Sequence, residues 1–188
     1  MKRRNFIKNA SLTGVGLAVG NSLLGCDDKY KKKSKEPVAV DVPKGSFPLV
    51  IATWNVKNAT SKAWEVIQNG GSALDAVEQG CMVEEADETG QSVGKGGLPD
   101  RDGHVTLDAC IMDKHGNCGS VVFLENVVHA VSVARKVMDE TPHVMLAGKG
   151  AEQFAYEKGF PKENLLTDAS KKAWEEWKKT SEYKPIIN

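Results

Sequence analysis

The residues of this sequence best suited to chemistry lie in a glycine-rich stretch, residues 92–103. Within it, Gly94-Lys95-Gly96-Gly97 invites comparison with a phosphate-binding loop. The Walker pattern, however, needs four residues between its glycines and a serine or threonine after the lysine, and neither is present. The stretch instead favours a loop whose glycines adopt positive φ or allow close backbone approach, which can place N–H groups against a substrate or a neighbouring catalytic loop.

The other polar residues give weaker signals for catalysis. The four histidines show no H-x-x-x-H or His/Cys spacing, so we expect no metal site, and nothing in the sequence indicates a cofactor. Asp100, Asp102 and Asp108 are closely spaced, but spacing alone does not define a paired-carboxylate glycosidase, and charges in solvated turns explain them better. No serine lies in a G-x-S-x-G elbow, which removes the main signature of a serine hydrolase of that kind.

Length and composition describe about one globular domain with short extensions. Of the 188 residues, 40% are hydrophobic and 27% are charged, a balance that supports a packed core. The 25 basic and 25 acidic side chains cancel, which disfavours binding to nucleic acid. Residues 1–25 hold four of the basic side chains and no acidic one, so residues 26–188 hold 21 basic and 25 acidic side chains, a net charge of −4.

The N-terminus has the order of regions expected of an export signal. Two arginines, Arg3 and Arg4, precede a weakly apolar stretch over residues 10–25 that is too short to span a bilayer. We interpret residues 1–25 as a twin-arginine signal peptide. Its end, Leu23-Leu24-Gly25-Cys26, resembles the bacterial lipobox, which makes Cys26 a lipid anchor. Residues 26–47 are predicted to be a solvated tether, and the product to be periplasmic or a membrane-anchored lipoprotein.

The other three cysteines, Cys81, Cys110 and Cys118, are an odd number in an oxidising compartment. At most one internal pair can form among them, and their connectivity stays open. None shows C-x-x-C spacing, so we expect all three to be small buried residues.

Hydrophobic patterning predicts the elements that position the loop. Residues 49–52 form a short apolar run that predicts a buried strand, with Thr53, Trp54 and Asn55 at its end. A helix capped by Thr60 or Ser61 should run to Gly70, and Ser72 should cap a second helix. On that second helix the small residues fall on one face, which predicts close packing against a sheet: Ala73, Ala76, Val77, Gly80 and Cys81.

The second half predicts a hairpin followed by helices. Residues 104–112 and 118–124 are apolar or alternating around a polar turn at residues 113–117. A helix through Val131 and Val137, an extended segment at 142–146, and helices at 151–158 and 169–179 should follow. Strand, two helices, hairpin and helices together predict an α+β class, with residues 48–188 forming the globular part.

Several segments occur together in an order that is similar to the α-chain region of the glycosylasparaginases, which are N-terminal nucleophile hydrolases. The matching segments are residues 53–55, 69–78, 92–103, 106–113 and 132–138. The resemblance runs from about residue 49 to the last residue, which is more specific than any single short motif.

That resemblance implies an αββα sandwich made as one precursor, which cuts itself into α and β chains. The new N-terminal threonine of the β chain is the nucleophile, and its free amine, with a pKa of ~7.7 to 8.0 against ~10.4 for lysine, takes the hydroxyl proton. In the family this threonine follows an aspartate, and none of the eight threonines here does. We therefore expect the sandwich to be incomplete, no catalytic residue in this chain, a nucleophile beyond residue 188, and no activity from this chain alone.

The resemblance also implies partners and a substrate. The expected partners are the β chain of the same precursor and a second copy, giving an (αβ)2 assembly. The expected reaction is hydrolysis of the amide between N-acetylglucosamine and asparagine in a small glycosyl-asparagine. An L-asparaginase or isoaspartyl peptidase of the same family, or a non-catalytic sugar-binding lipoprotein, stay open as alternatives.

The resemblance carries over to five residues that would support or bind substrate: Trp54, Asn55, Ser92, Gly96 and Gly97. Trp54 matches a tryptophan that lines the pocket; without the resemblance, a core tryptophan at a strand end is equally reasonable. Ser92 matches a serine near the cleavage site, and the glycines allow close packing there. Lys95 and Val56 stand where the family has aromatic residues, so the sugar preference is open.

Overall fold

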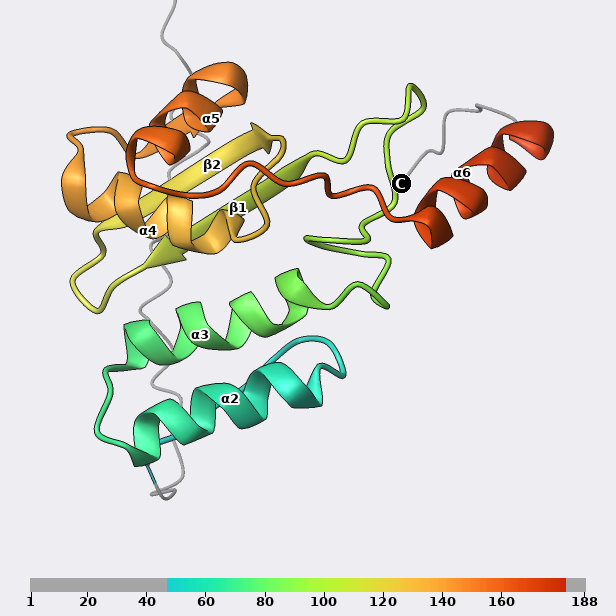
Figure 1. Cartoon of the computed structure of the whole chain (residues 1–188). Helices are drawn as coiled ribbons and strands as arrows, with labels where there is room; N and C mark the ends of the chain where they lie inside the picture. Colours follow the sequence, from blue (N-terminus) through green and yellow to red (C-terminus); the bar gives the residue numbers. More distant parts are fainter. Residues whose placement is uncertain (1–46, 182–188) are drawn as a thin grey trace, which may run out of the picture. The chain divides into compact units, whose positions relative to one another are not determined.

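The computed structural model describes residues 47–181. In that range the elements are α2 (Lys57–Gln68), α3 (Ala73–Ala86), β1 (Leu107–Met112), β2 (Cys118–Leu124), α4 (Ala130–Glu140), β3 (Met145–Ala147), α5 (Gly148–Glu157) and α6 (Asp168–Thr180) (Figure 1). The predicted signal peptide, nearly all of the tether, and Cys26 lie outside the described residues. No helix of the described part is both long and apolar enough to cross a membrane.

The helices α2 and α3 form a hairpin joined by a short turn. Ser72 caps α3 as predicted, because its hydroxyl accepts the N–H of Asp75 at 3.1 Å while the Asp75 carboxylate accepts the N–H of Ser72. The predicted cap of α2 at Thr60 or Ser61 is wrong, since the helix starts at Lys57. The Thr60 hydroxyl instead donates to carbonyls of the preceding turn.

Small residues let α2 and α3 approach closely. A Cβ added to Gly80 would lie 2.8 Å from the Ala59 carbonyl oxygen and 3.3 Å from the Ala63 Cβ. The prediction that this face of α3 packs on a sheet is therefore wrong, since its small residues face α2. Three residues expected on the buried face, Ala73, Val77 and Cys81, are exposed.

The sheet has the order β1-β2-β3 and contains the predicted hairpin. β1 pairs with β2 antiparallel, and β3 pairs with β2 in parallel. The hairpin turn is held by Asp113, whose carboxylate accepts the N–H groups of His115 and Asn117 at 2.8 and 2.9 Å. Together with α4, α5 and α6, which match the predicted helices, this arrangement confirms the α+β class.

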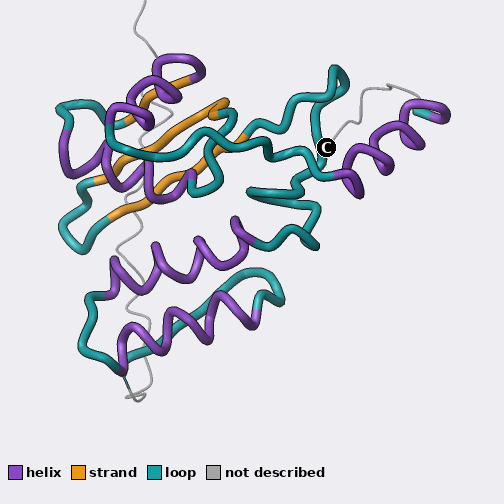
Figure 2. The backbone as a smooth tube through the Cα atoms, viewed as in Figure 1, coloured by secondary structure: helices purple, strands orange, loops and turns teal. Residues whose placement is uncertain are grey.

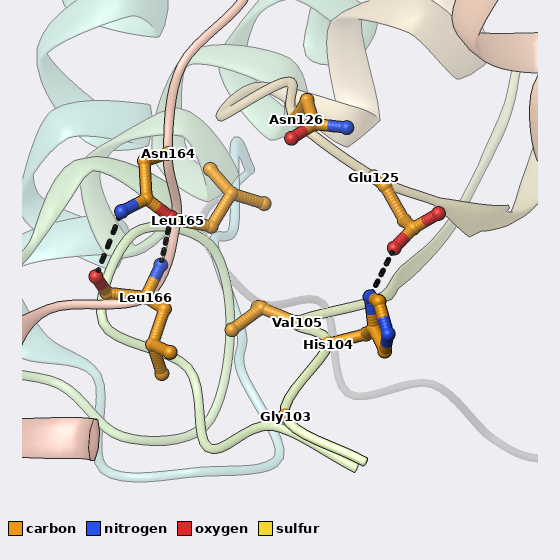
Figure 3. Close-up of a pocket in the computed structure, with 8 residues that line it drawn as sticks. All are labelled: Gly103, His104, Val105, Glu125, Asn126, Asn164, Leu165 and Leu166. Atoms are coloured by element: carbon orange, nitrogen blue, oxygen red, sulfur yellow. Dashed lines mark hydrogen bonds and ion pairs between the residues drawn. The ribbon is translucent and has the colours of Figure 1, made fainter. Parts of the chain in front are cut away.

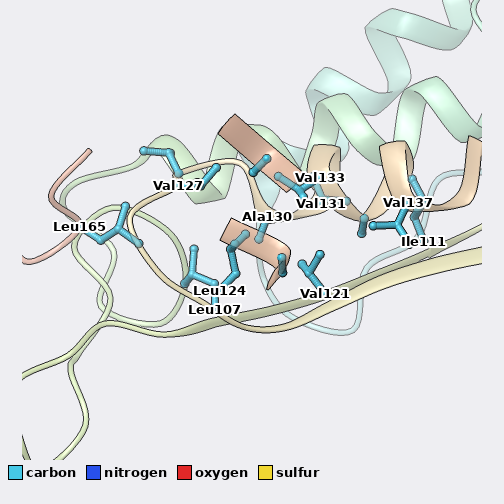
Figure 4. Packing of buried hydrophobic residues seen from close by; sticks show 14 of the residues in the cluster. Leu107, Ile111, Val121, Leu124, Val127, Ala130, Val131, Val133, Val137 and Leu165 are labelled. Atoms are coloured by element: carbon cyan, nitrogen blue, oxygen red, sulfur yellow. The ribbon is translucent and has the colours of Figure 1, made fainter. Parts of the chain in front are cut away.

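One face of the sheet is covered by α4 and α5 (Figure 2). Buried side chains from β1, β2 and α4 meet between them, including Ile111, Val121 and Val137 (Figure 4). The helix α4 approaches β2 so closely that a Cβ on Gly119 would lie 2.2 Å from the Ala134 carbonyl oxygen.

The opposite face of the sheet is exposed within the described part of the chain. Residues alternate along β1, so that Leu107 and Ile111 are buried while Cys110 and Met112 are exposed. Further exposed apolar side chains are Phe123 on β2 and Met145 on β3.

Two predictions about burial are wrong. Residues 49–52 form no strand, and the Ile51 side chain is 84% exposed, because no strand of the described chain pairs with this segment. The three cysteines of the described residues are free, with Cys81 and Cys110 exposed and Cys118 half-buried. The apolar residues of these segments suggested burial, but the sequence did not show whether another part of the chain would cover them.

Replacing Gly80 by alanine should destabilise the fold by about 1–3 kcal/mol, because the new methyl group meets the Ala59 backbone. The matched control is Gly150→Ala in α5, where a Cβ meets nothing within 4 Å. That change should leave stability unchanged or raise it by up to about 1 kcal/mol through helix propensity. Chemical denaturation measures both, and equal effects would show that the α2–α3 contact is not tight.

Candidate functional site

The glycine loop, residues 92–103, leaves the end of α3 and has no regular secondary structure, as predicted. Gly94 and Gly96 have φ of +62° and +95°, which favours glycine. A Cβ on Gly94 would lie 2.0 Å from the Glu85 carbonyl oxygen, and one on Gly96 would lie 2.7 Å from that of Glu88. The loop is thus folded back onto the end of α3, which confirms the close backbone approach that the glycines predicted.

Glu85 connects this loop to the rest of the molecule. Its backbone carbonyl accepts the N–H of Lys95 at 2.8 Å. Its side chain is buried, accepts the N–H of Val131 at 2.9 Å, and lies 3.3 Å from His129 Nδ1. Val131 is in the first turn of α4, where unpaired N–H groups and the helix dipole favour a carboxylate. One residue therefore holds the loop, the end of α3 and the start of α4.

The Lys95 side chain is engaged by carboxylates. Its Nζ lies 2.6 Å from Glu88 and 3.8 Å from Glu163. The hydrogen bond with Glu88 raises the pKa of Lys95, so the ammonium stays charged. Both acidic partners compete with any anionic ligand for this cation, which agrees with the absence of a Walker pattern.

The five residues carried over from the family resemblance do not form one cluster. Gly96 and Gly97 are buried, whereas Ser92, Asn55 and Trp54 are exposed, Trp54 by 67%. The alternative of a core tryptophan is therefore wrong for the described chain. Trp54 and Asn55 directly precede α2, and the hairpin brings the start of α2 to the same end as the exit of α3 (Figure 1). Among residues 47–181, no hydrogen bond joins these two residues to the loop.

The other candidate polar residues of the sequence have structural partners. The Asp100 carboxylate accepts the N–H groups of Asp102 and His104, and the bond from His104 lowers the pKa of Asp100. Asp108 accepts the N–H of Phe123 at 2.8 Å across the β1–β2 ladder, where the register shifts. The described residues contain no cluster of three or more His, Cys, Asp or Glu that could hold a metal ion.

A small polar cavity of about 110 Å³ lies beside the end of the glycine loop (Figure 3). His104 Nδ1 lies 3.2 Å from the Glu125 carboxylate at one side of it, and Asn164 lies at the other. Asn126 also lines the cavity, but its amide donates to Glu152. None of the five residues carried over from the resemblance lines this cavity.

The sequence alone did not identify three residues that hold the loop in place. Glu85 lies in an acidic run and His129 stands alone, so neither has a distinctive pattern. Ser170 is completely buried and donates to the Gly96 carbonyl, 74 residues away in the sequence. A contact over that separation leaves no local signal in one sequence.

Comparison with known proteins gives a consistent result. Residues 39–186 match the family described as asparaginase. The chain is 50% identical, over 99% of its length, to the N(4)-(β-N-acetylglucosaminyl)-L-asparaginase of Elizabethkingia miricola, covering 52% of that protein. It is 44% identical, over 75% of its length, to the enzyme of the same name in Rattus norvegicus, covering 42% of it.

A further relative carries a different name. The probable isoaspartyl peptidase/L-asparaginase 3 of Arabidopsis thaliana is 37% identical over 73% of the chain, which covers 39% of that protein. The chain therefore spans about half the length, or less, of these curated relatives.

Removing the Glu85 carboxylate should destabilise the protein. We expect Glu85→Ala to lower the free energy of unfolding by about 2–3 kcal/mol, because the Val131 N–H loses a buried charged acceptor. Glu65→Ala is the control, since its pair with Lys62 is exposed and should contribute less than about 0.5 kcal/mol. Urea denaturation measures both, and a Glu85 effect as small as the control would contradict this role.

Proposed function

Because this chain belongs to the asparaginase family, we propose that it is part of an amidohydrolase that cleaves the amide between N-acetylglucosamine and asparagine. The observation that carries this proposal is the 50% identity, over nearly the whole chain, with a protein named for that activity. The rat relative of the same name supports it.

The proposed mechanism uses an N-terminal threonine that lies outside these 188 residues. None of the eight threonines present follows an aspartate, which is the pair that self-cleavage requires. After cleavage, the free amine of the threonine would take the proton from its own hydroxyl, and the oxygen would attack the amide carbonyl. Hydrogen-bond donors would stabilise the resulting oxyanion by about 3 kcal/mol each. As the C–N bond breaks, the protonated amine would give its proton to the leaving nitrogen, and water would then hydrolyse the acyl-enzyme ester to release aspartate and regenerate the threonine. No cofactor enters this scheme.

The described residues would support this chemistry rather than perform it. The exposed ring of Trp54 offers an apolar face to the junction of sugar and asparagine. Asn55 stands next to it with an exposed amide. The glycine loop would lie beside the cleavage site, with the Ser92 hydroxyl free to hydrogen-bond there and the buried backbone of Gly96 and Gly97 allowing close packing.

The proposed complete fold is an αββα sandwich shared with a β chain. Two features of the described residues support it. The sheet face that carries Met112 and Met145 exposes apolar side chains, as expected of a face that a second sheet would cover. The extended segment around Ile51 exposes apolar side chains without a strand partner. Two such αβ units are proposed to pair as (αβ)2.

We also propose that the protein is exported. The basic and apolar regions of residues 1–25 support a twin-arginine signal, and Cys26 supports a lipid anchor that would hold a periplasmic enzyme at a membrane.

A second candidate function is that of an L-asparaginase or isoaspartyl peptidase. The Arabidopsis relative favours it, and so does Lys95, which stands at an expected aromatic position and is paired with Glu88. A smaller leaving group than a sugar would need less aromatic surface.

We expect the complete translated product that contains these residues to hydrolyse N-acetylglucosaminyl-asparagine with a higher kcat/KM than L-asparagine or a β-aspartyl dipeptide. Residues 26–188 alone should give no turnover, because the nucleophile is absent. Release of aspartate, followed for each substrate, measures these rates.

Each alternative result has a distinct meaning. Preference for the β-aspartyl dipeptide would replace the first candidate by the second. Turnover by residues 26–188 would contradict the proposed nucleophile. Sugar binding without turnover of any substrate by the complete product would indicate a binding lipoprotein.

A further inference from the structure

The glycine loop is held on its outer side by a segment that comes much later in the chain. Residues 163–174, here called the strap, comprise the link after α5 and the first turns of α6. Leu165 accepts the N–H of Gly96 at 2.8 Å, and Ser170 donates its hydroxyl to the Gly96 carbonyl. Both backbone groups of Gly96 are therefore bound by the strap.

The strap itself is firmly anchored. Leu165 is 3% exposed and belongs to the main hydrophobic core. Figure 3 shows Leu165 and Leu166 beside the end of the glycine loop. Further along, the Trp174 indole N–H donates to the Arg101 carbonyl at 3.2 Å, and the ring lies against Gly103. The strap therefore contacts the loop at Gly96 and again at residues 101–103. Because Leu165 belongs to the core, these contacts attach the loop to the core.

The Ser170 hydroxyl is not needed to cap α6. Thr167 is the N-cap of that helix, and its oxygen accepts the N–H of Ser170 at 3.3 Å. The Ser170 side chain is directed instead at the Gly96 carbonyl, and Ser170 is completely buried. The Thr167 hydroxyl also donates to the Ser170 hydroxyl at 3.2 Å, so the cap of α6 and the contact to the loop form one chain of hydrogen bonds, in which only Ser170 reaches the loop.

The loop has little freedom to compensate for a lost contact with the strap. On the inner side, Lys95 N–H is bound to the Glu85 carbonyl, and a Cβ on Gly96 would meet the carbonyl oxygens of Glu88 and Gly90 in the turn after α3. A carbonyl left without its buried donor would turn toward another partner. Such a turn would shift the neighbouring backbone, including that of Ser92 four residues earlier.

We propose that Ser170 is a positioning residue for self-cleavage: its hydrogen bond to Gly96 fixes the glycine loop, and with it Ser92, beside the scissile bond. This inference rests on the proposed function, in which that loop borders the cleavage site. Intramolecular reactions are sensitive to displacements of about 1 Å, so a small loop shift is enough to slow the step.

The test follows first-order self-cleavage of the complete precursor on denaturing gels. We expect Ser170→Ala to slow cleavage by about ten-fold or more. Ser170→Thr keeps a hydroxyl and should stay within about three-fold of the wild type. Asp168→Ala is the matched control, because it removes the exposed first-turn carboxylate of α6, which makes no hydrogen bond to the loop among the described residues; it should lower the melting temperature slightly but leave the rate unchanged.

Hydrogen exchange gives a second readout that a purely structural role in α6 would not move. Exchange in a peptide covering residues 92–97 should rise in Ser170→Ala and not in Asp168→Ala. If Ser170→Ala fails to fold, Trp174→Phe removes a different strap bond and replaces the indole by a smaller aromatic ring, and should slow cleavage about three-fold.

Several outcomes would overturn the inference. They are a wild-type rate in Ser170→Ala, equal slowing in Ser170→Ala and Asp168→Ala, a Ser170→Thr variant as slow as Ser170→Ala, or, where Ser170→Ala does not fold, an unchanged rate in Trp174→Phe. If the wild-type precursor does not cleave itself at all, the proposed function fails together with the inference. Failure confined to the variants refutes the role of Ser170 alone.

Discussion

The packing of α4 directly on β2 is the contact on which the other features of the described chain depend. It requires a position without a side chain at Gly119, where the helix backbone at Ala134 comes too close for any Cβ. This close approach lets the core of valines, leucines and alanines form between α4, α5 and the sheet. It also fixes where α4 begins, and the N–H groups at that end bind the Glu85 carboxylate.

Polar links then attach the α2–α3 hairpin to this core. Arg135 on α4 lies 3.3 Å from Asp75 and 3.4 Å from Glu78, both on α3. Glu85 makes the deeper link at the other end of α3, because its carboxylate is buried. These contacts fix the orientation of α3 relative to α4. They therefore fix the position of its C-terminal end, after which the glycine loop follows. The loop is a consequence of the packing, although its glycines look like an independent motif in the sequence.

The proposed function gives the exposed surfaces a common explanation. Three features are unusual in a folded domain by itself: exposed apolar side chains on one sheet face, an unpaired extended segment near Ile51, and an exposed Trp54. They are expected of a chain that shares its sandwich with a second one and contributes the walls of a site rather than its nucleophile. The strap and Glu85 would hold one such wall, the glycine loop, in place from opposite sides.

The sequence by itself determined the features that depend on neighbouring residues. The cap at Ser72, the hairpin turn at Asp113, the irregular glycine loop, the later helices and the family were all predictable, because capping, turns and periodicity act within a few residues. Tertiary structure decided what long-range contacts control. It placed Gly80 against α2 instead of a sheet, left residues 49–52 unpaired, exposed Cys81, and brought Glu85 and Ser170 to the loop. Such contacts join residues tens of positions apart, and no local pattern in a single sequence records them.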